Sequence, residues 1–348
     1  TISEKNSDIN AFIEVFSEEA LARAKQIDLK ISEGTSSKLA GFVLGIKDNI
    51  CIKNHKVSAS SKILQGFTSL YSATVIERLL SEDAIIIGRL NCDEFAMGSA
   101  NENSVYGSVK NPLDNTKVPG GSSGGCAAAV AANMCLATLG SDTGGSIRQP
   151  ASFCGLVGLK PTYSRVSRHG LIAYASSFDQ IGPLTNTVED AALLLEVIAG
   201  KDKMDSTSSS MQVDDYSSFI KPVKRKIAVL KDCLEREGLD VEVKQKLEST
   251  IQQLQDDGHE ITYVSFPYLD FLVPTYYVLT TAEASSNLAR FDGVHYGYRI
   301  ENPENLEDTY IDSRTTAFGD EVKRRIMLGT FVLSAGYNDE YYKKAQQV

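Results

Sequence analysis

Two short segments rich in glycine and serine contain the residues best suited to nucleophilic chemistry. PGGSSGG occupies residues 119–125 and SDTGGSIR occupies residues 141–148, so that Ser122 and Ser146 lie 24 positions apart. Clusters of glycine and serine are usually turns. Here two clusters lie close together and each leads into a helical pattern, and this combination favours a functional site.

Three familiar site motifs fit these segments poorly. Neither segment is a P-loop, because the lysine of GxxxxGK[ST] is absent, and no GxGxxG follows a strand. Residues 121–125 match GxSxG, but a polar loop precedes them where a nucleophile elbow needs a strand. A Ser-His-Asp triad is therefore disfavoured, since the four histidines also lie in polar surroundings: His55, His169, His259 and His295. A cysteine nucleophile is weaker still, because no cysteine lies on a sharp turn flanked by glycine.

A lysine is the remaining base for a serine nucleophile. Its pKa must fall several units below about 10.4, which requires burial. Lys47 is the lysine best placed for this, because it follows the apolar run GFVLGI at residues 41–46. The alternative is an ordinary solvated surface lysine. A second serine could relay the proton, and the N–H groups of Thr143, Gly144 and Gly145 could converge on an oxyanion.

Residues 119–155, followed by KPTYSRVSRHG at 160–170, resemble the amidase signature family. Members of that family hydrolyse amides with a triad of serine, cis-serine and lysine. The resemblance implies that Lys47 is the base and that Ser146 is the acylated nucleophile. It implies that Ser122 is the bridging serine, beside a cis peptide bond. It also makes residues 143–145 the oxyanion loop.

Two charged residues flank that loop. Asp142 and Arg148 could in principle react, but the chemistry already has a base in Lys47. We therefore expect both residues to brace the loop. Two departures from the family pattern, Ser164 and Cys126, lie away from the nucleophile and are expected to be tolerated.

Three further segments narrow the resemblance to the A subunits of glutamyl-tRNA(Gln) amidotransferases: FAMGSANENS (95–104), EASSNLARFDGVHYGYR (283–299) and residues 318–346. This implies that the chain hydrolyses glutamine and supplies ammonia to a B subunit, which binds tRNA and uses ATP and Mg²⁺. A small C subunit braces the pair. The resemblance implies no cofactor or metal in this chain.

The same resemblance assigns two residues to glutamine binding. Arg325 would bind the α-carboxylate and Tyr276 would line the same pocket. The alternative for Arg325 is a charge on a helix surface, because Lys323 and Arg324 precede it. Two other functions stay open at this point. The chain could be a stand-alone amidase acting on another small amide, or a catalytically incomplete subunit that serves assembly.

Helical and strand patterns alternate along the chain, which indicates an α/β fold. Strands are expected at 11–16, 41–46, 84–88, 136–139, 226–231 and 260–266, and helices at 17–30, 74–82, 126–134, 188–198, 241–256, 274–291 and 319–334. The family resemblance implies an α/β/α layered fold with a mixed central sheet. We expect a single amidase domain over residues 1–348, truncated at both ends, with a polar surface loop at 201–220.

Composition restricts the partners. The chain has 35 Lys and Arg against 45 Asp and Glu, a net charge of −10, and no long basic run. Direct binding of nucleic acid is therefore disfavoured, and tRNA would be met only through the B subunit.

Six cysteines without a CxxC pair indicate reduced thiols and a cytoplasmic protein. No secretory signal and no apolar run of about 18 residues is visible, so no membrane contact is expected.

Overall fold

The computed structural model describes residues 1–220 and 223–348 and contains a six-stranded mixed sheet. Its strand order is β1-β3-β2-β4-β6-β5. The central pairs β2–β3 and β2–β4 are parallel, whereas β1, β6 and β5 run antiparallel to their neighbours. The expected mixed α/β sheet is thus confirmed. The bounds are β1 Phe12–Val15, β2 Val43–Lys47, β3 Ile85–Leu90, β4 Ala137–Asp142, β5 Val157–Gly158 and β6 Gln180–Thr185.

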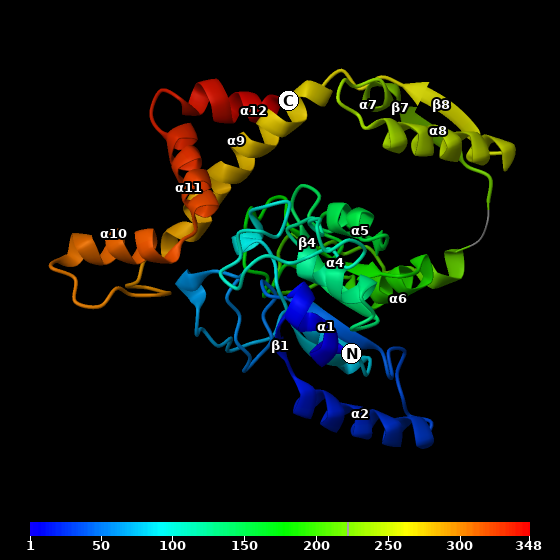
Figure 1. Ribbon diagram of the computed structural model, residues 1–348, viewed down its shortest axis with the longest axis horizontal. Coiled ribbons are helices and arrows are strands. Elements are labelled where there is room, and N and C mark those ends of the chain that lie inside the picture. The colour runs from blue at the N-terminus through cyan, green and yellow to red at the C-terminus, as the bar shows by residue number, and fades with distance from the viewer. Residues whose placement is uncertain (221–222) are drawn as a thin grey trace.

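Helices cover both faces of this sheet, which gives the layered arrangement seen in Figure 1. On one face α3 (Thr74–Ser81) and α6 (Val188–Ile198) bury their apolar sides against Leu44, Ile46 and Leu139. On the other face α1 (Ile2–Ile9), α4 (Gly124–Ala131) and α5 (Arg148–Phe153) form a second core. The helix α2 (Ser17–Ser32) packs against β3 with Ala20 and Ile27.

The short helix α4 is the element that sets the site against the sheet. Its residues Gly124–Val130 are all buried, and their small side chains let the helix lie close to the strands. The helix begins at Gly124, two residues earlier than expected. At Gly125 a Cβ would lie 2.4 Å from the backbone oxygen of Asn91, so the close approach requires glycine.

A helical layer follows the sheet in sequence and supplies one wall of the site. It contains α9 (Leu269–Asn287), α10 (Leu306–Ala317), α11 (Asp320–Leu333) and α12 (Lys343–Gln347), with irregular turns η4 (Leu288–Arg290) and η5 (Asn338–Tyr342). A third core of Phe95, Tyr174, Leu288 and Phe318 joins this layer to the turns η1 (Lys62–Leu64) and η2 (Glu94–Ala96).

A separate βαβ unit precedes α9. The strands β7 (Lys226–Leu230) and β8 (Glu260–Val264) pair in parallel, with α7 (Lys231–Leu234) and α8 (Val241–Asp256) between them. The sequence predicted both strands and α8, but not α7. None of these elements contains a buried residue. In Figure 1 the unit lies away from the six-stranded sheet, beyond the loop at 201–215 and the turn η3 (Tyr216–Phe219).

Five elements lie outside the predicted helices and strands: α1, β5, β6, α7 and α10. The strand β6 (QIGPLT) contains glycine and proline and lacks alternation, yet all six residues are buried. The helix α10 lies between the two helices predicted at 274–291 and 319–334, and Asn305 caps it by accepting a hydrogen bond from Asp308 N–H. Among the described residues, no helix combines the length and apolar character needed to cross a bilayer.

Candidate active site

Lys47 lies at the carboxyl end of β2, inside the molecule. Leu44 and Ile46 point into the core beneath α3 and α6, so alternation along the strand directs Lys47 to the opposite face, beside α4. Its side chain is completely inaccessible to solvent. This excludes the alternative of a solvated surface lysine.

Hydroxyl groups surround the Lys47 amine. Its Nζ lies 2.7 Å from Ser122 Oγ, 2.9 Å from Ser123 Oγ and 3.0 Å from Ser141 Oγ. No carboxylate within the described ranges lies close enough to form an ion pair with it. The sequence pointed to Ser122 as a partner of Lys47, but it did not show that Ser123 and Ser141 also contact the amine. Only the fold brings the end of β2 beside the end of β4 and the start of α4.

Burial lowers the pKa of Lys47 from its usual value. Four acidic groups oppose this shift without cancelling it: Cys92, Cys126, Asp93 and Asp142. The two thiols weaken the shift little at neutral pH, since burial raises the pKa of each to about 12 and they remain protonated. A buried lysine with a lowered pKa can accept a proton, which is what a general base requires.

Ser122 belongs to the turn that leads into α4. The peptide bond between Gly121 and Ser122 is cis, in agreement with the expectation from the family resemblance. Gly121 N–H donates a hydrogen bond to the side-chain oxygen of Gln149, 3.0 Å away. Ser123 N–H donates to Ser146 O at 3.1 Å, so the two glycine-rich segments of the sequence lie side by side.

Ser146 lies in the loop between β4 and α5. It is 8% exposed, so it is nearly buried but reachable from the cavity described below. Asp142 shapes the loop before it by accepting hydrogen bonds from the N–H groups of Gly145 (2.7 Å) and Ile147 (3.0 Å). Arg148 donates to the same carboxylate with Nε and Nη2, each at 3.0 Å.

Asp142 and Arg148 therefore brace the loop, as expected. Burial alone would raise the pKa of Asp142, but the hydrogen bonds from Arg148 and the backbone hold that pKa below its usual value. The N–H of Gly145 donates its hydrogen bond to this carboxylate and is not available to a ligand. In the described chain, the N–H groups of Thr143, Gly144 and Ser146 have no hydrogen-bond acceptor.

A cavity of about 210 Å³ opens above Ser146. Its walls include Gly144, Gly145, Tyr276 and Arg325 together with Gly98, Ser99, Gly121, Gln149 and Tyr277. At Gly144 a Cβ would lie 2.6 Å from the Tyr276 ring, so glycine is needed where loop and ring meet. The structure thus brings residues from α9 and α11 close to Ser146 and the loop that follows β4.

Arg325 is the cationic group of this cavity. It projects from α11, is 6% exposed, and is held by Glu321 at 2.8 Å from Nε and by Tyr174 Oη at 3.0 Å from Nη1. The Tyr174 and Tyr277 rings lie 5.4 and 5.3 Å from its guanidinium carbon. This burial excludes the alternative of a helix-surface charge. Such a fixed guanidinium suits a carboxylate ligand.

The competing nucleophilic mechanisms find no support in this cavity. No histidine is among the described residues that line it. Five of the six cysteines are buried, and Cys233 lies exposed in α7, outside the cavity. Within residues 1–220 and 223–348, no group of three or more His, Cys, Asp and Glu side chains could hold a metal ion.

Together, the fold and this site indicate an enzyme that hydrolyses amides. A model of the family described as Amidase matches residues 1–348. The chain therefore belongs to the amidase signature family.

Within the family, its relatives are more specific. It is 55% identical over 349 residues to the A subunit of glutamyl-tRNA(Gln) amidotransferase from Chlorobium phaeobacteroides, covering 99% of this chain and 73% of that one. The crystal structure of the corresponding protein from Thermotoga maritima has a TM-score of 0.75 at 36% identity, covering 99% of this chain and 68% of that one. Native peptide amidase from Stenotrophomonas maltophilia gives 0.81 at 30% identity, covering 100% and 72%.

Proposed function

We propose that this chain is the glutamine-hydrolysing subunit of a tRNA-dependent amidotransferase. The observation that carries the proposal is the buried Lys47 amine, 2.7 Å from Ser122 Oγ and without an ion-pair partner in the described chain, beside the loop that bears Ser146. The likeness to amidotransferase A subunits supports glutamine as the amide.

In the proposed acylation step, Ser146 Oγ attacks the side-chain amide carbon of glutamine. Its proton passes to Ser122, whose own proton passes to neutral Lys47. The carbonyl oxygen becomes an oxyanion, which the N–H groups of Thr143, Gly144 and Ser146 stabilise. In this set of donors Ser146 N–H replaces the Gly145 N–H expected from the sequence, because Gly145 N–H donates its hydrogen bond to Asp142.

The intermediate then collapses. Lys47 returns its proton through Ser122 to the nitrogen, the carbon–nitrogen bond breaks, and ammonia leaves. A γ-glutamyl ester remains on Ser146. Water attacks this ester with Ser122 and Lys47 again taking up the proton, glutamate is released, and Ser146 regains its proton. No redox agent or cofactor is needed for this balance.

Arg325 and Tyr276 position the substrate in this proposal. The guanidinium binds the α-carboxylate of glutamine, and Tyr276 closes the pocket over the glycine loop. The ammonia is used by a B subunit that binds tRNA and consumes ATP with Mg²⁺, and a C subunit completes a cytoplasmic complex. This chain itself carries no cofactor and meets tRNA only through the B subunit.

The test is a glutaminase assay of the purified chain, alone and together with B and C subunits. Glutamate release is expected to be strongest in the complex. Ser146→Ala should reduce it to background, and Lys47→Ala should reduce it by roughly 10³-fold. The matched controls are Ser152→Ala, an exposed serine of the same segment, and Lys53→Ala, an exposed lysine near Lys47; both should keep wild-type rates.

Other outcomes identify the alternatives. Hydrolysis of simple amides without partners, and none of glutamine, would favour a stand-alone amidase. A complex that forms but hydrolyses no amide would favour an assembly subunit. Full activity in Ser146→Ala would end the triad assignment.

A further inference from the structure

A buried carboxylate lies beneath the loop that precedes the nucleophile. In the β4–β6 ladder, Asp142 pairs with Gln180, so the next residues along, Thr143 and Asp179, also lie beside each other. Thr143 Oγ1 donates a hydrogen bond of 2.6 Å to Asp179 Oδ1. The proposed mechanism uses the backbone of Thr143 and assigns no role to this hydroxyl or to Asp179.

The same carboxylate also holds the turn that carries Tyr174. Asp179 Oδ2 accepts hydrogen bonds from Tyr174 N–H at 2.8 Å and from Ala175 N–H at 3.1 Å. Tyr174 Oη in turn accepts the 3.0 Å hydrogen bond from Arg325 Nη1. One side chain therefore connects the nucleophile loop to the arginine of the substrate pocket.

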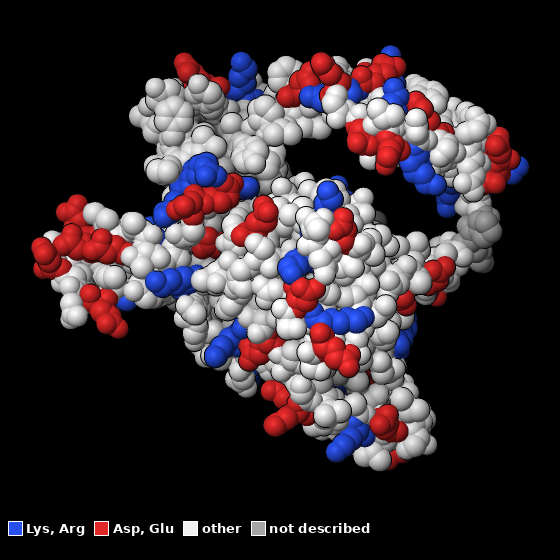
Figure 2. All heavy atoms as spheres, viewed as in Figure 1, with Lys and Arg blue, Asp and Glu red and all other residues white. Residues whose placement is uncertain are grey.

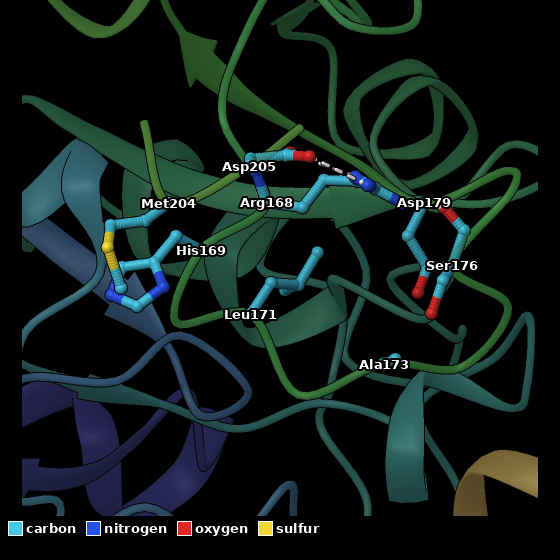
Figure 3. A pocket seen from close by; sticks show the side chains of 8 residues that line it. All are labelled: Arg168, His169, Leu171, Ala173, Ser176, Asp179, Met204 and Asp205. Atoms are coloured by element: carbon cyan, nitrogen blue, oxygen red, sulfur yellow. Dashed lines mark hydrogen bonds and ion pairs between the residues drawn. The ribbon is translucent and has the colours of Figure 1, made fainter. Parts of the chain in front are cut away.

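Asp179 makes these contacts without a cation at hydrogen-bond distance. It is 3% exposed, and no described residue forms an ion pair with it. Figure 3 shows it beside Ser176 at one end of a neighbouring pocket, with Arg168 between it and Asp205. Arg168 is paired with Asp205 at 2.8 Å. Glu283 of α9 accepts a hydrogen bond from Ser177 N–H, in the turn that carries Tyr174.

We propose that Asp179 is a positioning residue for acyl transfer, which orients Thr143 and the oxyanion loop directly and Arg325 through Tyr174. This inference rests on the proposed function of the site. The loop at 143–146 contains two adjacent glycines and so has little conformational restraint of its own. Its anchors are the carboxylates at its two ends, Asp142 for Gly145 and Asp179 for Thr143.

The test separates the loop from glutamine binding by using an alkyl fluorophosphonate, which has no α-carboxylate. Ser146 Oγ forms a bond to phosphorus as fluoride leaves and the serine proton passes towards Lys47. The second-order rate constant for labelling Ser146, followed by mass spectrometry, therefore reports the nucleophile and the oxyanion loop. Asp179→Asn should lower it roughly 10- to 100-fold, because the amide cannot accept from all three N–H and O–H donors.

A double-mutant cycle tests whether Asp179 acts through Thr143. Thr143→Val should slow labelling as Asp179→Asn does, and Thr143→Ser, which keeps a hydroxyl, should lose less. The double variant Asp179→Asn with Thr143→Val should be within about threefold of Thr143→Val, because coupled effects do not multiply. The KM for glutamine should nevertheless rise in the double variant relative to Thr143→Val, since Tyr174 and Arg325 lose their anchor.

Asp83→Asn is the matched control for general destabilisation. Asp83 is also fully buried and accepts a hydrogen bond from Ser37 N–H at 2.9 Å, but it lies beside α2, away from the cavity. It should lower the melting temperature and leave the labelling rate unchanged.

Three results would overturn the inference. One is an Asp179→Asn variant that labels at the wild-type rate, which leaves the proposed function intact. A second is a cycle in which the two losses multiply, which would show that Asp179 does not act through Thr143. The third is a wild-type chain in which Ser146 is not labelled at all, which would overturn the proposed function as well.

Discussion

At the scale of single residues, the contrast between neighbours on α11 is informative. Arg324 and Arg325 both contact Glu321, but the Arg324 side chain is 68% exposed and that of Arg325 is 8% exposed. A substitution at Arg325 therefore acts inside the cavity, whereas the same substitution at Arg324 acts at the surface. The pair supplies a variant and its control in adjacent positions.

We predict that Arg325→Lys raises the KM for glutamine at least about tenfold and lowers kcat less. Lysine keeps the charge but loses the planar fork that can bind a carboxylate with two hydrogen bonds. Steady-state glutaminase kinetics measure both constants, and Arg324→Lys should leave both unchanged. Equal effects of the two substitutions would remove Arg325 from the substrate site.

At the scale of elements, a buried acid fixes the beginning of α11. Glu94 is 3% exposed; its Oε2 accepts a hydrogen bond from Gly319 N–H at 2.9 Å, and its Oε1 accepts one from Ser61 Oγ. Gly319 is the residue that precedes the helix. Burial raises the pKa of Glu94 to about 7 from a usual value of 4.5.

This shift predicts a pH dependence with a definite sign. A raised pKa means that the folded chain binds the proton more tightly than the unfolded chain. The resulting stabilisation is complete below pH 4.5, falls as the pH rises through about 7, and amounts to about 3 kcal/mol at most. Urea unfolding between about pH 5 and 7.5 should show this loss in the wild type and a smaller loss in Glu94→Gln.

Glu102→Gln is the control for that comparison, because Glu102 lies in the same segment but is exposed. Its pH dependence should equal that of the wild type. Asp179, whose pKa burial raises to about 6, titrates in the same range, but it contributes equally to all three proteins. An unchanged slope in Glu94→Gln would contradict the assignment of this pH dependence to Glu94.

At the scale of the whole molecule, the two sheets differ sharply in burial. Every residue of β4 and β6 is buried, whereas β7, α8 and β8 contain none that is. We predict that amide hydrogens of the β7–β8 unit in the isolated chain exchange at least about 10²-fold faster than those of β4 and β6. Hydrogen exchange followed by mass spectrometry measures this, and equal protection would show that the molecule opens as one unit.

Charge also varies over the molecule. Figure 2 shows acidic side chains gathered at the end of the molecule that α10 forms, and its first turn carries Glu307 and Asp308. Such a surface repels phosphate groups, which agrees with the proposal that tRNA is met through another subunit.

The sequence by itself identified the fold class, the residues proposed as the triad and the amidase family. Strong helices and strands such as α8 and β2 were predicted because their apolar periodicity is local. The glycine and serine segments were recognisable because close backbone approaches restrict residue type, as Gly144 against Tyr276 illustrates.

Only the tertiary structure decided which polar groups share a site. β6 escaped prediction because its burial comes from neighbours on both faces, so its sequence shows no alternation. Ser141, Asp179 and Tyr174 are unremarkable in the sequence, since each acquires its contacts from segments far along the chain. The lowered pKa of Lys47 likewise arises from burial, which depends on how β2 and α4 pack against each other.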